Sequence, residues 1–139
     1  GLTDGYEFGQ TWRRDLLNTL VGSQIMVKRC FSLLRKEDVG MVGPEKWKSD
    51  FVGTNENQIN HFKKLLNIKS GKSDFVAGTM FWTKYDMLSN YFDNVDLMDI
   101  YNNLEENHIT DNNEGRLTHS LERIFGMIVS DSKKKISWI

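Results

Sequence analysis

Apolar residues recur at helical spacing over much of the chain. Between residues 11 and 35 they return every three or four positions, which predicts amphipathic helix. Gly22-Ser23 interrupts the pattern, and serine is favoured at helix N-termini, so we expect two consecutive helices with Ser23 capping the second. The first ten residues are rich in glycine and are expected to form a loop. The same helical spacing predicts further helices over residues 55–67, 85–92, 97–105 and 115–130.

Short apolar runs predict the strands. Residues 39–43, closed by Gly43-Pro44, form one run, and residues 75–82 form a second. Residues 135–139 are a candidate for a third strand. Helices that alternate with strands are typical of α/β architecture. We therefore expect one helix-rich α/β domain over residues 1–139 with a small sheet of two to three strands. Because an average sheet has about five strands, we also expect the chain to be a fragment of a larger protein.

Composition narrows the class of protein. The chain has 139 residues, 39% hydrophobic and 27% charged, which is sufficient for one domain with a real core. The net charge is −1 and the basic residues look scattered, so we expect no nucleic-acid partner. The one cysteine, Cys30, lies in an apolar helical pattern and is expected to be buried. The sequence contains no apolar run of about 20 residues that predicts a transmembrane segment.

The densest group of chemistry-bearing side chains is Glu114–Arg123, which holds two carboxylates, one imidazole and two guanidinium groups. Helical spacing places His119, Glu122 and Arg123 opposite the apolar residues of this helix. Charged helix faces are usually just solvated, so the helix alone is a weak indication of a site. Glu114 precedes the helix, where the backbone dipole favours the ionised carboxylate that a general base requires.

Two other segments stand out. Gly78 lies inside the second predicted strand, where glycine is costly unless a ligand, a bulge or close packing needs the space. The aromatic side chains of Phe81 and Trp82 fit a sugar face as well as they fit a core. At the start of the first helix, Trp12 is a candidate anchor, and Arg13 and Arg14 are candidates for phosphate binding. The alternative for that segment is an ordinary amphipathic helix start.

In chain order, these motifs resemble the rhamnan synthesis F family of bacterial glycosyltransferases. The matching segments are Trp12-Arg13, Gly40–Pro44, Ala77–Trp82 and Glu114–Arg123. The family pattern has Asp at the position of Glu114 and Thr at the position of Arg116.

The resemblance implies the C-terminal half of a GT-A-type catalytic domain that transfers a sugar, usually rhamnose, from a nucleotide-sugar donor to a cell-surface polysaccharide. It implies a saccharide acceptor, a divalent cation (Mg or Mn), and a cytoplasmic location peripheral to the inner face of the membrane. A missing N-terminal half would supply much of the nucleotide pocket. We therefore expect the isolated chain to be inactive.

Carried onto this chain, the resemblance makes Glu114 the base, His119 a contact to diphosphate or metal, and Glu122 a third catalytic residue. The implied substrate-binding residues are Trp12, Arg13, Gly78, Thr79, Trp82 and Arg123. Two alternatives stay open at this point. One is a non-catalytic carbohydrate-binding or interaction module built on the aromatic strand. The other is a small hydrolase that uses Glu114 and Glu122 as paired carboxylates.

Overall fold

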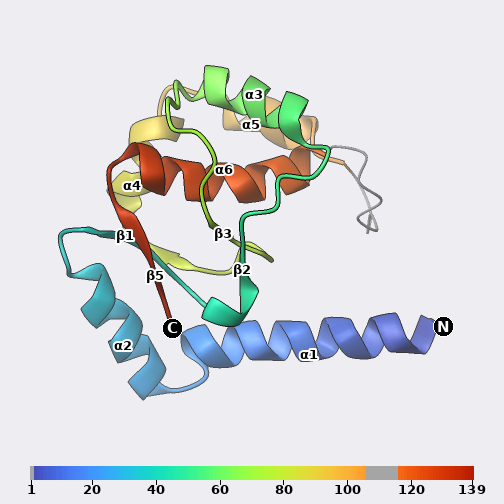
Figure 1. The fold of residues 1–139 in the computed structure, drawn as a ribbon, viewed down its shortest axis with the longest axis vertical. Helices are drawn as coiled ribbons and strands as arrows, with labels where there is room; N and C mark the ends of the chain where they lie inside the picture. The colour runs from blue at the N-terminus through green and yellow to red at the C-terminus, as the bar shows by residue number, and fades with distance from the viewer. Residues whose placement is uncertain (1, 106–115) are drawn as a thin grey trace.

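A helical hairpin forms the N-terminal side of the molecule in the computed structural model, which describes residues 2–105 and 116–139 (Figure 1). Its helices are α1 (Leu2–Val21) and α2 (Gln24–Leu34). The Ser23 hydroxyl accepts the Met26 N–H at 3.2 Å, which confirms the predicted cap. The loop predicted for the first ten residues is wrong, because residues 2–10 continue α1. Each glycine there costs about 1 kcal/mol in a helix, but extending an existing helix adds one hydrogen bond per residue.

A three-stranded sheet lies beside this hairpin. It consists of β4 (Trp82–Thr83), β1 (Val39–Gly43) and β5 (Lys135–Trp138) in that order. Strand β1 pairs antiparallel with β4 and parallel with β5. Every residue of β1 is buried, as the apolar run predicted. The predicted C-terminal strand is confirmed. In Figure 1, β1 and β5 lie between α6 above and the hairpin below.

A second, two-stranded sheet corrects the strand predicted over residues 75–82. The short 3-10 helix η1 (Glu45–Trp47) leads into β2 (Lys48–Ser49), which pairs antiparallel with β3 (Phe75–Val76). After Val76 the chain turns and then joins the other sheet as β4. The turn contains Gly78 at φ 97° and Thr79 at φ 56°. Both angles lie in the left-handed region, so these residues cannot continue an extended strand. The structure therefore agrees with the predicted helix-rich α/β class and its small sheet of two to three strands, because β4, β1 and β5 form one three-stranded sheet. The second sheet, β2 and β3, was not predicted.

The helix α6 (Leu117–Asp131) runs through the middle of the fold and contacts α3 (Glu56–Leu65), α4 (Tyr85–Phe92), β3 and β5 (Figure 1). Its residues Ile124 and Ile128 are fully buried. A short helix, α5 (Leu97–Asn102), adds Ile100 to the same core. The predicted helices are therefore confirmed, with ends that shift by a few residues. In the described part of the chain, no helix has the length and apolar character needed to cross a membrane.

Candidate functional site

The side chain of Glu122 connects α6 to the turn after β3. One of its carboxylate oxygens accepts the backbone N–H of Gly78 in a short hydrogen bond. The other accepts a hydrogen bond from Nη1 of Arg123 at 3.1 Å. Both oxygens are engaged, and the side chain is only 15% exposed. Glu122 therefore holds the Gly78-Thr79 turn in place rather than pointing a free carboxylate into solvent.

Arg123 is buried, with 5% of its surface exposed. Its Nε donates to the carbonyl of Phe51 at 3.1 Å, and its Nη1 donates to the carbonyl of His119 at 2.7 Å. The guanidinium also lies over the Phe75 ring, 4.8 Å from the centroid. A charge removed from water needs such partners, because an unpaired buried charge costs several kcal/mol. The alternative of a solvated charged face on α6 is thus wrong for Arg123.

Trp12 occupies the space beside Gly78. A Cβ atom at Gly78 would lie 2.3 Å from the Trp12 ring, so no larger residue fits there without movement. The edge of Trp12 also meets the Trp47 ring, at a centroid separation of 6.0 Å. Of the explanations for Gly78 left open by the sequence, the structure shows close packing. Trp12 thereby fixes α1 against the turn that Glu122 holds.

Thr79 is the exposed residue of this turn. Its φ of 56° is unusual for a β-branched side chain, and such backbone strain is concentrated at functional sites in proteins. Trp12, Gly78, Glu122 and Arg123 come from three distant segments and are joined at Gly78, the residue before Thr79. We call this group of five residues the turn cluster.

The remaining candidate residues lie elsewhere. Trp82 belongs to a second apolar cluster, where its indole N–H donates to the Leu20 carbonyl at 3.1 Å and its ring packs on Phe31. Arg13 is exposed on α1. His119 is half-buried on α6, where its carbonyl joins the turn cluster through Arg123. Glu114 lies outside the described residues, so its role stays a prediction.

A cation site is not evident within residues 2–105 and 116–139. No group of three or more His, Cys, Asp and Glu side chains in these ranges is arranged to hold a metal ion. The described residues around His119 therefore do not by themselves fit a divalent cation, which normally takes several oxygen or nitrogen ligands. Cation binding through His119 remains a prediction from the family resemblance.

Two side chains hold the N-terminus of α6, and the sequence analysis assigned neither of them this role. The carboxylate of Glu105 accepts the Leu117 N–H at 2.6 Å, the Thr118 N–H at 3.2 Å and the Thr118 hydroxyl at 2.8 Å. Asn55, which is 3% exposed, accepts the Arg116 N–H at 3.0 Å. A carboxylate at this position is favoured by the helix dipole and by the unsatisfied first-turn N–H groups. No local pattern signals a cap that comes from 12 residues upstream.

Glu105→Gln is expected to remove a pH-dependent part of the stability. Burial opposes ionisation of Glu105, but the hydrogen bonds from Leu117 and Thr118 outweigh it and hold the pKa below its ordinary value of 4.5. A depressed folded-state pKa gives stability that is present above the unfolded-state pKa and lost as pH falls through the folded-state pKa. Thermal unfolding should therefore show the wild type losing its advantage over Glu105→Gln below about pH 4.5. A difference in melting temperature that stays constant between neutral pH and pH 3 would contradict this assignment.

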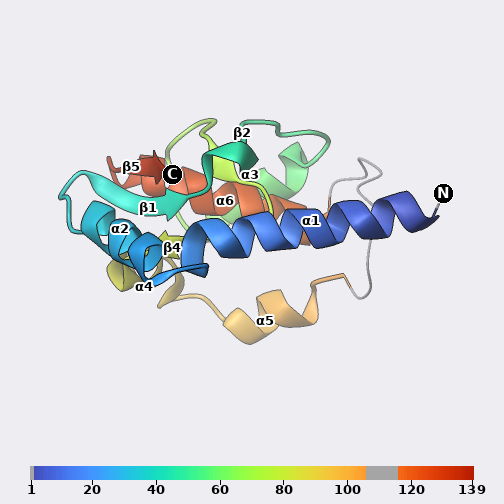
Figure 2. The same cartoon turned by 90° about the horizontal axis from the view of Figure 1, so that it is seen from below.

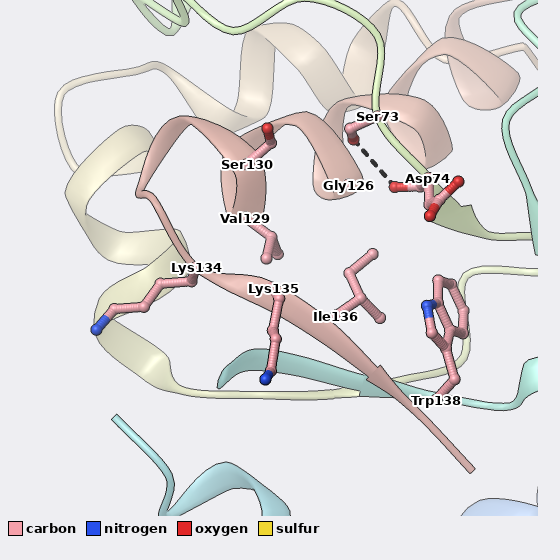
Figure 3. A pocket seen from close by; sticks show the side chains of 9 residues that line it. All are labelled: Ser73, Asp74, Gly126, Val129, Ser130, Lys134, Lys135, Ile136 and Trp138. Carbon is pink, nitrogen blue, oxygen red and sulfur yellow. Dashed lines mark hydrogen bonds between the residues drawn. The ribbon is translucent and has the colours of Figure 1, made fainter. Parts of the chain in front are cut away.

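A small hollow lies between the C-terminal half of α6, β5 and the segment before β3 (Figure 3). Gly126 forms part of its wall, and Lys134 and Lys135 lie at its edge. Lys134 donates to the Glu37 carbonyl at 2.5 Å, and Lys135 pairs with Asp38 at 2.6 Å. The volume is about 190 Å³, whereas ligand pockets usually measure about 300–1,000 Å³. This hollow is too small for a complete nucleotide sugar.

The model of the family described as Rhamnan synthesis protein F matches residues 2–134, which is nearly the whole chain. The chain belongs to the rhamnan synthesis protein F family. The turn cluster brings together three of the segments on which the resemblance to this family was based: Trp12-Arg13, Ala77–Trp82 and the part of α6 that ends at Arg123.

Two curated relatives come from Xanthomonas campestris pv. campestris and are named uncharacterized protein WxcX. The chain is 24% identical to the protein of strain B100 and 23% identical to that of strain ATCC 33913, over 94% of its own length in both cases. It spans 19% of the length of each relative. No solved structure matches the chain.

Proposed function

We propose that this chain is part of a nucleotide-sugar-dependent glycosyltransferase of the GT-A type that extends a cell-surface polysaccharide. The family description supports a role in polysaccharide synthesis. The observation that carries the finer proposal is the turn cluster, in which Glu122 and Arg123 fix the strained Gly78-Thr79 turn against Trp12. A buried network that holds an exposed strained turn is typical of a substrate-binding position, since pre-organised contacts do not have to be formed during the reaction.

In the proposed reaction, Glu114 removes the proton from the acceptor hydroxyl as that oxygen attacks the anomeric carbon of the donor sugar. Thr79 contacts a sugar hydroxyl, and Glu122 and Arg123 act as positioning residues. The leaving diphosphate needs positive charge, for which His119 and Arg13 are the candidates in this chain. Mg or Mn would supply the same charge, with ligands beyond the described residues. Rhamnose is the first donor sugar to test.

We further propose that the protein works in the cytoplasm at the inner face of the membrane. The rest of the catalytic domain would supply the first strands of the sheet and the nucleotide pocket. On this basis the isolated chain should not transfer sugar.

The transferase proposal is favoured over a carbohydrate-binding module by the positions of the aromatic rings. Phe75 is 2% exposed, Phe81 packs on Phe125 at 5.3 Å, and Trp82 packs on Phe31 at 5.1 Å. These rings support the core and the helices around it. A sugar-binding platform needs exposed ring faces, so the aromatic run that motivated the alternative offers it little support.

Glu114→Gln is expected to lower sugar transfer by at least about 100-fold, because a positioned general base contributes roughly that much. The variant should be made in the protein that contains this chain, with Glu37→Gln as a matched control on an exposed carboxylate. Transfer from dTDP-rhamnose and other nucleotide sugars would be measured together with their binding by calorimetry. Binding should survive in Glu114→Gln. Near-normal transfer by that variant would exclude the base role, whereas binding of no nucleotide sugar would contradict the transferase proposal itself.

A further inference from the structure

Positive charge is concentrated in residues 10–36, which comprise the C-terminal part of α1, all of α2 and the two residues after it. The start of α1 adds Asp4 and Glu7, so residues 2–36 as a whole carry +3. Residues 10–36 contain six Lys and Arg residues and one Asp, whereas the whole chain contains 18 Lys and Arg and 19 Asp and Glu. This segment therefore carries +5 in a chain whose net charge is −1, which leaves −6 on all other residues. Along the sequence the basic residues look scattered, because they come as separate pairs. In the folded chain, Arg13-Arg14 lie on α1, Lys28-Arg29 lie on α2, and Arg35-Lys36 follow the C-terminal end of α2.

These six side chains are exposed. None of them forms an ion pair with a carboxylate within the part of the chain that the structure describes. The single acidic residue of the segment, Asp15, is already paired with Lys46 from outside it. These six charges therefore have no ion-pair partner among the described carboxylates, and Asp38, which follows Lys36 closely in sequence, pairs with Lys135 instead.

Apolar side chains are exposed between the basic ones. On α1, Arg14, Leu17 and Val21 follow one another at spacings of three and four residues, opposite the buried Leu16 and Leu20. Leu17 is 41% exposed and Val21 is 49% exposed. This side of α1 therefore combines apolar and basic side chains, whereas an ordinary solvated helix face carries only polar and charged ones.

The second helix repeats the arrangement. Ile25, Lys28 and Arg35 lie on the side of α2 opposite the buried Cys30 and Leu34, and Ile25 is 77% exposed. Figures 1 and 2 place α1 and α2 together on one side of the molecule. We call the outward side of these two helices the hairpin face.

We propose that the hairpin face docks on the surface of a bilayer that contains anionic phospholipids. Basic side chains near such a surface each contribute attraction to the negative lipid headgroups, and exposed apolar side chains enter the boundary between headgroups and acyl chains. A second copy of the chain fits less well, because two positively charged faces repel each other. The phosphate backbone of a nucleic acid would attract the basic side chains. Because that backbone is polar, it would not bury the exposed side chains of Ile25, Leu17 and Val21. The inference does not depend on sugar transfer.

Vesicle sedimentation tests the proposal with the protein that contains this chain. The protein should bind vesicles with about 30% phosphatidylglycerol in phosphatidylcholine and should not bind pure phosphatidylcholine. Each basic residue near the surface contributes about fivefold in binding, so Arg14→Glu with Lys28→Glu should weaken binding at least about 25-fold. Ile25→Ser should weaken it further. Added salt should weaken it as well, because exposed charges are screened.

The matched control is Lys64→Glu with Lys72→Glu. It makes the same change in net charge at exposed positions on α3 and in the segment before β3. This control should bind as the wild type does. If it loses as much binding as the hairpin variant, net charge rather than the hairpin face is responsible and the proposal is wrong.

Two further results would overturn the proposal. One is absence of binding to the anionic vesicles at low salt. The other is full competition with the vesicles by a DNA duplex at equal phosphate concentration.

Thermal unfolding must give the same melting temperature for the hairpin variant and the control. If the double variant Arg14→Glu, Lys28→Glu does not fold, the double variant Arg29→Glu, Arg35→Glu replaces it in the same binding measurement. Retention of binding by this second variant counts against the proposal.

Discussion

Arg123→Ala is expected to lower the free energy of unfolding by about 3–5 kcal/mol, which is the cost of breaking a buried ion pair by removing one partner. The loss has three sources. Glu122 keeps its charge at 15% exposure without a counter-ion, the carbonyls of His119 and Phe51 lose their donor, and the guanidinium no longer covers Phe75. Denaturant unfolding followed by tryptophan fluorescence measures the change.

The matched control for this prediction is Arg29→Ala. Arg29 is exposed on α2 and makes no ion pair with a carboxylate that the structure describes, so its loss should change the stability by no more than about 0.5 kcal/mol. Glu122→Gln is a second comparison, because the amide oxygen can still accept the Gly78 N–H while the charge pair is lost. If Arg123→Ala and Arg29→Ala destabilise the protein equally, the buried network does not stabilise the fold as described.

Gly126→Ala is expected to destabilise the protein by about 1–3 kcal/mol, although the same change in an open helix is stabilising. A Cβ atom at position 126 would lie 2.1 Å from the backbone oxygen of Asp74 and 3.0 Å from Cβ of Phe75. Backbone cannot rotate away as a flexible side chain can, so α6 and β3 would have to move apart. That movement would loosen the packing between the helix that carries Glu122 and Arg123 and the strand that leads to Gly78.

Gly9→Ala provides the control with the opposite sign. Gly9 lies in α1, and a Cβ atom there would have no described atom within 4 Å outside the neighbouring backbone of its own helix. Alanine there should raise the stability by about 0.5–1 kcal/mol, because it restricts the unfolded chain and favours the helix. Both variants are compared with the wild type in the same denaturant titration. If both glycine substitutions raise the midpoint, α6 and β3 are not packed as closely as the structure indicates.

Local pattern was enough to predict most of the helices and strands. Ser23 caps α2 because its hydroxyl lies three residues from the N–H that it accepts, and β1 is buried because its five residues carry only small or apolar side chains. The four motifs along the chain were also sufficient to indicate the family. Each of these features depends on residues that are close together in sequence, so their spacing alone contains the information.

The contacts across the fold decided the rest. Nothing near Gly78 in sequence shows that Trp12 fills the space beside it and that Glu122 accepts its N–H. Helical spacing correctly placed Arg123 opposite the apolar side chains of α6, but it could not tell that Phe51 and Phe75 cover that side. The scattered basic pairs likewise come near one another only because α1 and α2 pack against each other. The sequence by itself thus determined the helices, most strands and the family motifs, because those are local patterns. The tertiary structure alone decided the burial of Arg123, the charge pairing and the turn cluster, because these depend on segments that are distant in sequence.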